Sequence, residues 1–220
     1  MKITNQGSKL TCTVDNHGYY LSRSLSPKVY EDVHASVSIP HPMSCVISRI
    51  WHGLFLVDRF RSDFSSSEVS VSAAHGEHLF EIELEKNEIL SFQIKFLVGF
   101  TYHTYLHTCI SFSLSSILAN KIFVQVARGP CKLLFCCSGV HEIALSETAK
   151  FAFSPERMVA WHPKTNFSFS GIKKAIDIYF NPVRLRIANA KSQTYVILDS
   201  DDHKESRSTV LSRIKEVLIP

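Results

Sequence analysis

The fold of this chain is decided by residues 121–163, which read KIFVQVARGPCKLLFCCSGVHEIALSETAKFAFSPERMVAWHP. Short apolar or alternating runs are separated here by turn signals, namely Arg128-Gly129-Pro130, Ser138-Gly139 and Ser154-Pro155-Glu156. β-rich runs punctuated at intervals of about 8 to 12 residues are typical of a β-sandwich or barrel. The stretch therefore predicts a series of short strands joined by tight turns, and with them an all-β fold.

Further runs of the same kind predict strands along most of the chain. They lie at residues 10–14, 69–73, 78–84, 89–94, 96–100 and 105–114. Residues 33–39 and 44–50 flank Pro40-His41-Pro42, and because proline interrupts helices we expect a hairpin or corner there. The alternation of Glu81, Glu83 and Glu85 with apolar residues predicts a strand with one solvated face.

These patterns divide the chain into three segments. Residues 1–64 form an N-terminal β segment of the same body, residues 65–200 hold repeated β units, and residues 201–220 change character. In the last segment apolar residues recur at helical spacing and predict a short amphipathic helix. Its apolar stripe contains Val210, Leu211, Ile214 and Leu218. Such a short helix is marginal alone, so we expect the stripe to pack on the β body; docking on a protein partner or on a membrane surface is the alternative.

An internal repeat emerges when two parts of the chain are aligned. Three pairs of segments match, namely 88–92 with 149–153, 97–100 with 158–161, and 102–106 with 163–167. A unit of about 55 to 60 residues then occurs twice, and stacked β units of this kind share one core. The alternative is that any two β-meanders look alike at this level.

The composition is that of a packed globular protein. The chain has 220 residues, is 45% hydrophobic and carries a formal net charge of +4, which is milder than the basic excess of a dedicated nucleic-acid binder. The six cysteines lie in apolar runs without a C-x-x-C pair, which predicts reduced, buried thiols and no structural zinc site. The first residues, MKITNQGSKL, contain no apolar leader, and no apolar run is long enough to span a membrane. We therefore expect a cytoplasmic protein.

The same stretches resemble a known protein family. The resemblance lies in a glycine turn followed by a strand, and in a later strand with a hydrophobic-Val-Ala-aromatic ending. The residues are Gly129, Leu133, Gly139, Leu145, Phe153, Met158, Val159, Ala160 and Trp161, echoed by Gly76, Leu97, Val98 and Phe100. Over residues 65–198 this order is similar to that of the altered-inheritance-of-mitochondria mitochondrial biogenesis family.

The family resemblance implies a fold more than an activity. It implies a β domain similar to the tryptophan RNA-binding attenuation protein, with no known catalytic residues and often with self-association into a scaffold. The chain departs from the family pattern in having only eight glycines, and Pro130 stands where a second glycine is expected. No functional residue is carried over from the family.

Histidine is the residue type that best suits a metal site, with eleven copies. His103 and His107 are the candidates, because they are four residues apart. His75 and His78 are further histidines of the same part of the chain. In a strand His103 and His107 share a face but lie about 13 Å apart, too far to hold one ion. A cupin-like metalloenzyme also needs a His-x-His with a nearby glutamate, which the sequence lacks. We therefore expect surface or hydrogen-bonded histidines, and no cofactor.

Nucleophilic catalysis has no motif to support it. The chain contains no Gly-x-Ser-x-Gly elbow and no phosphate-binding glycine loop. Cys136 or Cys137 with His141 could form a thiolate and its base, but burial in a strand raises the pKa of a thiol and makes it inert. No catalytic residue is assigned.

Arg184, Arg186 and Lys191 are the candidates for a nucleic-acid or partner surface, since they project from one side of a predicted strand. Single-strand binders pair such charges with stacking aromatics, and Tyr179 and Phe180 are adjacent in the sequence. The modest net charge opposes this function, so the favoured interpretation is a solvated edge strand protected by its charges.

Together these patterns predict an all-β, sandwich- or barrel-like domain of repeated β-meander units with a short C-terminal α-helix. We expect a non-catalytic scaffold that forms a homo-oligomer or binds a protein partner. Two alternatives stay open: a cupin-like metal-binding enzyme using His103 or His107, and a single-stranded RNA binder using Arg184 and Arg186.

Overall fold

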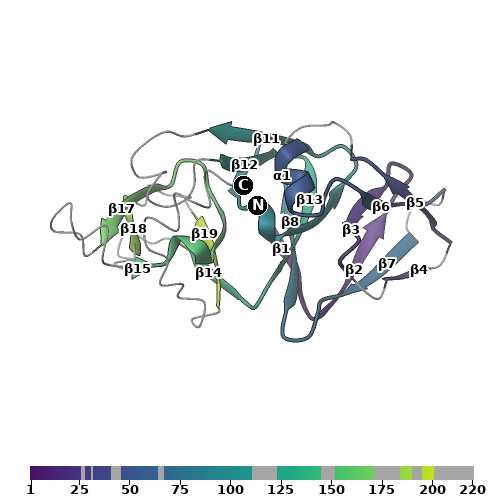
Figure 1. Ribbon diagram of the computed structural model, residues 1–220, viewed down its shortest axis with the longest axis horizontal. Helices are drawn as coiled ribbons and strands as arrows, with labels where there is room; N and C mark the ends of the chain where they lie inside the picture. The colour runs from purple at the N-terminus through teal and green to yellow at the C-terminus, as the bar shows by residue number, and fades with distance from the viewer. Residues whose placement is uncertain are drawn as a thin grey trace. The chain divides into compact units, whose positions relative to one another are not determined.

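The computed structural model describes most of the chain (Figure 1). It covers residues 1–25, 28–30, 32–40, 46–63, 67–110, 123–144, 152–170, 184–189 and 195–200. The described residues form nineteen strands, one short α-helix and two 3-10 helices, so the predicted all-β fold is confirmed. The chain divides into two compact units. Unit 1 comprises Met1–Thr108 and Gln125–Gly139, and unit 2 comprises Cys109–Val124 and Val140–Pro220.

Unit 1 contains a seven-stranded antiparallel sheet. Its strand order is β1 (Lys2–Gly7), β8 (His78–Leu84), β13 (Cys131–Cys137), β10 (Leu97–Thr101), β3 (Tyr19–Ser22), β6 (Val57–Arg61) and β5 (His34–Ser38). Strands that are covered on both faces read as continuous apolar runs. The run Leu133-Leu134-Phe135 in β13 is of this kind, and all three side chains are fully buried.

A smaller sheet of unit 1 packs against the larger one. It consists of β2 (Lys9–Val14), β7 (Ser67–Ser72) and β4 (Lys28–Tyr30), which lie together in Figure 1. Along β2, Leu10, Cys12 and Val14 are buried and the residues between them are not, which is the period-two pattern predicted for this strand. Residues of the larger sheet complete this core, namely Tyr19, Leu21, Phe60, Leu79 and Leu134.

Three further strands contribute to unit 1. β12 (Phe123–Arg128) pairs with β9 (Ile89–Phe92), and β11 (Tyr105–Ile110) is the next strand beyond β12. Gln125 is buried in β12, and its side-chain oxygen accepts a hydrogen bond of 3.1 Å from Thr108 Oγ1. Leu106 is buried and Tyr105 is exposed, so the two faces of β11 differ in burial.

The run that follows the hairpin or corner expected at Pro40-His41-Pro42 contains a helix, whereas residues 41–45 lie outside the described residues. α1 (Val46–Trp51) is only six residues long. Its apolar residues recur in the sequence at i, i+1, i+4 and i+5, a helical spacing that is hard to recognise in so short a run. Arg49 in the last turn favours the helix through its dipole, and Gly53 follows with the left-handed backbone (φ 69°) that ends helices.

Unit 2 contains two groups of antiparallel strands. The first group is β16 (Met158–Trp161), β19 (Tyr195–Asp199) and β14 (Val140–Ala144), and the second is β15 (Ala152–Phe153), β18 (Arg184–Asn189) and β17 (Asn166–Ser170). The second group lies together at one end of the view in Figure 1. A core is formed by buried residues of both groups, namely Phe153, Met158, Trp161, Leu185, Val196 and Leu198.

One pairing pattern occurs three times among these strands. β7 lies between β2 and β4, β13 between β8 and β10, and β19 between β14 and β16. Likewise β6 lies between β3 and β5, β12 between β9 and β11, and β18 between β15 and β17. The registers agree in detail, because Gly99 of β10 faces Leu134 and Ala160 of β16 faces Ile197, each directly after a register shift. A 3-10 turn precedes each of these two strands, η1 (Ile94–Phe96) before β10 and η2 (Pro155–Arg157) before β16.

Gly99 lies where β10 pairs with β3. A Cβ atom at this position would lie 2.7 Å from Leu21 Cδ2 and 2.9 Å from the carbonyl oxygen of Tyr20. No side chain fits there, so the close pairing of these strands requires glycine. Gly129 is constrained in the same way, because its Cβ would collide with the carbonyl oxygen of Glu85.

The two predicted segment boundaries, after residue 64 and after residue 200, can be compared with the structure in turn. β6 and β7, which lie before and after the boundary predicted between residues 64 and 65, both belong to unit 1. The C-terminal helix predicted at residues 201–220 lies outside the described residues. Among the residues that are described, no helix is long and apolar enough to cross a membrane.

Candidate functional site

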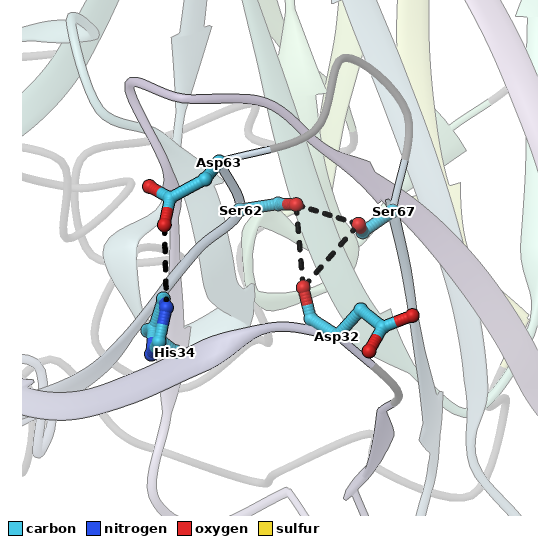
Figure 2. Close-up of polar contacts among 5 residues, drawn as sticks. All are labelled: Asp32, His34, Ser62, Asp63 and Ser67. Carbon is cyan, nitrogen blue, oxygen red and sulfur yellow. Dashed lines mark hydrogen bonds and ion pairs between the residues drawn. The ribbon is translucent and has the colours of Figure 1, made fainter.

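Figure 2 shows a polar cluster where two connections of unit 1 meet. The hydroxyls of Ser62 and Ser67 lie 2.6 Å apart, and each lies within donating distance of the main-chain carbonyl of Asp32, at 3.3 and 3.5 Å. Asp32 lies between β4 and β5, whereas the serines lie at the two ends of the connection from β6 to β7. Asp32 has a left-handed backbone (φ 53°), which aspartate tolerates better than most residues. The cluster therefore holds the two connections together.

The same cluster contains the residue types of a hydrolase triad. His34 Nε2 lies 3.4 Å from Asp63 Oδ2, and both side chains are largely exposed. In Figure 2 the imidazole points at Asp63, whereas the serine hydroxyls point at each other and at the carbonyl of Asp32. A nucleophilic serine needs its hydroxyl within hydrogen-bond reach of the base. Because Ser62 is fully buried and directed to a main-chain carbonyl, the arrangement suits a structural role.

Glu81 is buried, which corrects the prediction of a solvated face on β8. Only 3% of the residue is exposed; Oε1 lies 3.6 Å from Lys132 Nζ, and Oε2 accepts a hydrogen bond of 3.4 Å from the Tyr19 hydroxyl. The pattern misleads because β8 is covered on both faces, and the residues on either side of Glu81 are fully buried as well. Of the other two glutamates, Glu83 is half-buried and Glu85 is exposed. A buried carboxylate is costly unless it is paired, and Lys132 and Tyr19 provide that pairing.

Cys12 lies beside Tyr19 in the core of unit 1. Burial, reinforced by the charge of Glu81, raises the pKa of the Cys12 thiol to about 12. Burial also raises the pKa of the Tyr19 hydroxyl well above its ordinary value, with the charges of Cys12 and Glu81 acting in the same direction. Since both groups keep their protons at neutral pH, neither is poised as a nucleophile or base. This network stabilises the core.

The thiols considered as nucleophiles are engaged elsewhere. Cys136 is half-buried and donates to Glu77 Oε2 at 3.2 Å, and Cys137 is buried and donates to the carbonyl of Gly139 at 3.1 Å. The side chain of His141 lies outside the described residues. Cys109 in β11 is exposed, against the prediction that the thiols are buried, because the face of β11 that carries it points outward.

Four side chains from three segments of unit 1 form a surface cluster of rings and one cation, which we call the ring cluster: His17, Arg59, Tyr102 and His103. The guanidinium carbon of Arg59 lies 4.2 Å from the centre of the Tyr102 ring, and Arg59 Nη2 donates to the carbonyl of His17 at 3.0 Å. The ring of His103 contacts Tyr102 and His17, with centroid distances of 4.7 and 4.9 Å. Asp15 shapes the first turn, because its Oδ1 accepts two backbone N–H groups. The ring cluster joins the turn between β2 and β3 to the turn between β10 and β11.

The two metal candidates, His103 and His107, have different ring partners. His103 lies in the turn after β10, where we expected a strand, because Thr104 N–H bonds back to the carbonyl of Thr101 and closes that turn. His107 lies in β11, with its ring 4.1 Å from that of Tyr105, and both histidines are exposed. The described parts of the chain contain no group of three or more His, Cys, Asp or Glu side chains that could hold a metal ion.

Arg184 and Arg186 are exposed on β18, and Leu185 between them is buried. β18 is the middle strand of its group, between β15 and β17, so the interpretation as a protected edge strand is wrong. The candidate RNA or partner surface stays a prediction. Several residues named for such surfaces lie outside the described part of the chain, namely Lys191, Val210, Leu211, Ile214 and Leu218.

Comparison with known proteins points to a shared fold. No protein-family model matches the chain, and no curated protein matches it. Among solved structures, the crystal structure of a Streptococcus pyogenes protein from a structural genomics consortium is similar over 99% of this chain and 97% of its own, with a TM-score of 0.55 and 11% sequence identity. A likeness at that identity is one of fold alone.

Proposed function

We propose that this protein is a non-catalytic β scaffold that works by self-association or by binding a protein partner. The observation that carries the proposal is that the reactive side chains described below make structural contacts within the described part of the chain. Glu81 is paired with Lys132 inside the core, Cys12 and Tyr19 keep their protons, and the serines of Figure 2 hold a main-chain carbonyl. An active site needs such groups to converge where a substrate can reach them. Here they stabilise strands and connections.

We further propose that the scaffold consists of three copies of one six-stranded unit, β2–β7, β8–β13 and β14–β19. In each copy the sixth strand lies between the first and the third, and the fifth lies between the second and the fourth. Corresponding strands of the last two copies begin 61 residues apart. β10 begins at Leu97 and β16 at Met158, and β11 begins at Tyr105 and β17 at Asn166. This extends the twofold repeat predicted from the sequence. The first copy is harder to recognise because it contains α1.

The family resemblance is part of this proposal. We infer that the chain is a distant member of the altered-inheritance-of-mitochondria mitochondrial biogenesis family, because two of its motifs occupy constrained positions. Gly129 lies where a side chain would collide with a carbonyl, and the Met-Val-Ala-Trp motif is the buried strand β16. A cytoplasmic location belongs to the same proposal. It is supported by the free thiols of the described cysteines, which are typical of a reducing compartment.

The experiment that tests the scaffold proposal is a native mass spectrum of the gently purified full chain. A discrete homo-oligomer or a retained protein partner, with no metal or small ligand, supports the proposal. A monomer that retains one transition-metal ion contradicts it, and loss of the metal in His103→Ala but not in His75→Ala would locate the site. Salt-sensitive binding of single-stranded RNA, weakened by Arg184→Ala and Arg186→Ala but not by Arg61→Ala, would contradict it in favour of RNA binding.

A further inference from the structure

We propose that β5 is the strand through which two copies of this chain associate, by antiparallel pairing of β5 with β5 of the second copy. This inference rests on the proposed self-association and names its surface. It follows from the position of β5 at the edge of a sheet, from the features that protect other edges, and from the sequence of the strand itself.

β5 ends the seven-stranded sheet. In the strand order of the described residues it neighbours β6 alone. Four of its five residues are exposed and Ser38 is half-buried, whereas β6 contains the buried residues Val57 and Phe60. The outer backbone groups of an edge strand are a template for pairing with another chain. β5 is therefore accessible from its outer side.

The other edge strands of the two unit 1 sheets carry features that hinder such pairing. β1 begins with Lys2 and has a register shift between Thr4 and Gln6, and β2 and β4 begin with Lys9 and Lys28. Lysines and bulges at sheet edges are common protections against edge-to-edge association. They make pairing at these three edges unfavourable.

β5 lacks these protections. Its sequence, His-Ala-Ser-Val-Ser, contains no Lys, Arg, Asp, Glu or Pro, and its register with β6 is regular from His34 to Ser38. Its one ionisable side chain, His34, already lies 3.4 Å from Asp63. The strand therefore presents a regular and uncharged edge.

The sequence of β5 is also complementary to itself. In antiparallel pairing about an axis at Val37, Val37 faces its own copy, Ala35 faces Ile39 and Ser36 faces Ser38. Apolar residues then meet apolar residues and no like charges are opposed. Val37 and Ile39 are 59% and 43% exposed, so both have surface to bury. A contact of this symmetry closes on itself, which gives a dimer and not a fibre.

Pairing at β5 would cover exposed apolar side chains beside the core of unit 1. Cross-strand partners point to the same face of a sheet, and Ala35 is the partner of Phe60 in β6. Val37 shares this face with Ala35 because side chains alternate along a strand. Phe60 belongs to the core between the two sheets of unit 1. Val37 itself faces Asp58 of β6, and both Ala35 and Val37 are exposed, so a second β5 would cover apolar side chains that lie beside this core.

The test uses Val37→Lys and Val37→Glu in the full chain, examined by native mass spectrometry and light scattering over a range of concentrations. The wild type should be a dimer, and each variant should raise the dissociation constant by roughly tenfold or more, because like charges meet at the axis. An equal mixture of the two variants should restore the dimer, because Lys then faces Glu. Tyr105→Lys is the matched control, since Tyr105 is 49% exposed on β11, and it should leave the dimer intact.

Three results would overturn the inference. If both Val37 variants dimerise like the wild type, the copies associate elsewhere, and the scaffold proposal stands without β5. If the variants dissociate but their mixture does not reassociate, the antiparallel pairing about Val37 is wrong. A wild type that is monomeric at every concentration excludes self-pairing, and bound metal in that monomer would overturn the scaffold proposal as well. Circular dichroism of each variant checks that the fold is retained.

Discussion

Lys132 and Glu81 form an ion pair at the margin of the unit 1 core, with Lys132 Nζ 3.6 Å from Glu81 Oε1. The two partners differ in exposure, because 32% of the lysine side chain and 4% of the glutamate side chain is accessible to solvent. The buried glutamate thus relies on neighbouring protein groups for its stabilisation, whereas the partly exposed lysine can be hydrated when the ion pair is broken. Loss of the lysine therefore leaves the less tolerant partner without its counter-charge.

Lys132→Met should lower the free energy of unfolding by about 1–3 kcal/mol, because it leaves a buried carboxylate with fewer partners. Urea denaturation measures the change. Lys86→Met is the control, since Lys86 is exposed in the turn between β8 and β9 and its loss should change stability by less than about 0.5 kcal/mol. Equal effects of the two substitutions would show that the ion pair contributes nothing.

Gly99→Ala should destabilise the protein by about 1–3 kcal/mol, because the new methyl group overlaps Leu21 and the Tyr20 carbonyl and forces β10 away from β3. Gly7→Ala serves as the control, since the nearest atom to its Cβ is the Lys9 carbonyl oxygen at 3.4 Å, an ordinary contact. Thermal or urea denaturation compares the two variants. A Gly99→Ala protein as stable as Gly7→Ala would mean that the strands separate without cost.

Arg59→Ala should lower the free energy of unfolding by about 1–2 kcal/mol, because it removes both the contact with the Tyr102 ring and the hydrogen bond to the His17 carbonyl. Arg61→Ala is a matched control on the same strand, since Arg61 is exposed. Arg59→Lys should recover part of the loss, because a lysine keeps the charge and not the planar donor. An unchanged stability in Arg59→Ala would show that the ring cluster does not hold the two turns.

Stability should fall as the pH rises above about 9, because burial raises the pKa values of Cys12 and Cys131 from 9.0 to about 12. The raised pKa of Tyr19 acts in the same direction. Between pH 9 and 12 the folded state keeps protons that the unfolded chain has released, so the stabilisation is complete below pH 9 and is lost as the pH rises through this window. Urea denaturation between neutral pH and the lower part of this window measures the slope.

Two substitutions test whether the buried thiols, and not other groups that titrate at alkaline pH, cause this loss of stability. Cys12→Ala should flatten the decline of stability with pH, whatever its effect on stability at neutral pH. Cys109→Ser should leave the decline unchanged, because Cys109 is exposed. A stability that rises with pH would contradict the assignment.

Strand positions could be predicted well because they depend on a local pattern. Residues 78–84 were expected to form a strand and β8 is His78–Leu84, and the apolar run at residues 158–161 is β16. The helix α1 could not be predicted in this way, since six residues make fewer than two turns and a neighbouring proline run favours extended structure. The pattern of alternation shows that a strand exists, and strand pairing decides how much of it is buried.

The polar groups of the core could not be predicted, because they come from different strands. Tyr19, Glu81 and Lys132 lie on β3, β8 and β13, and only the sheet brings them together. One signal was present: the run Leu79-Phe80-Glu81-Ile82 sets one charge among three large apolar residues, which is unusual for a solvated strand. The exposed arginines of β18 show the reverse case, since a charged face does not reveal whether its strand lies at an edge or in the middle of a sheet.

The pairing of β3 with β10 has a consequence for the protein during its synthesis. β3 is complete at Ser22, but Gly99, Phe100 and Thr101, to which it pairs, are translated almost eighty residues later, and β1 must likewise wait for β8. Unpaired strand edges in a nascent chain favour aggregation and chaperone binding. The ribosome therefore presents β1 and β3 with unpaired edges, and the seven-stranded sheet is complete only when β13 has emerged from the exit tunnel.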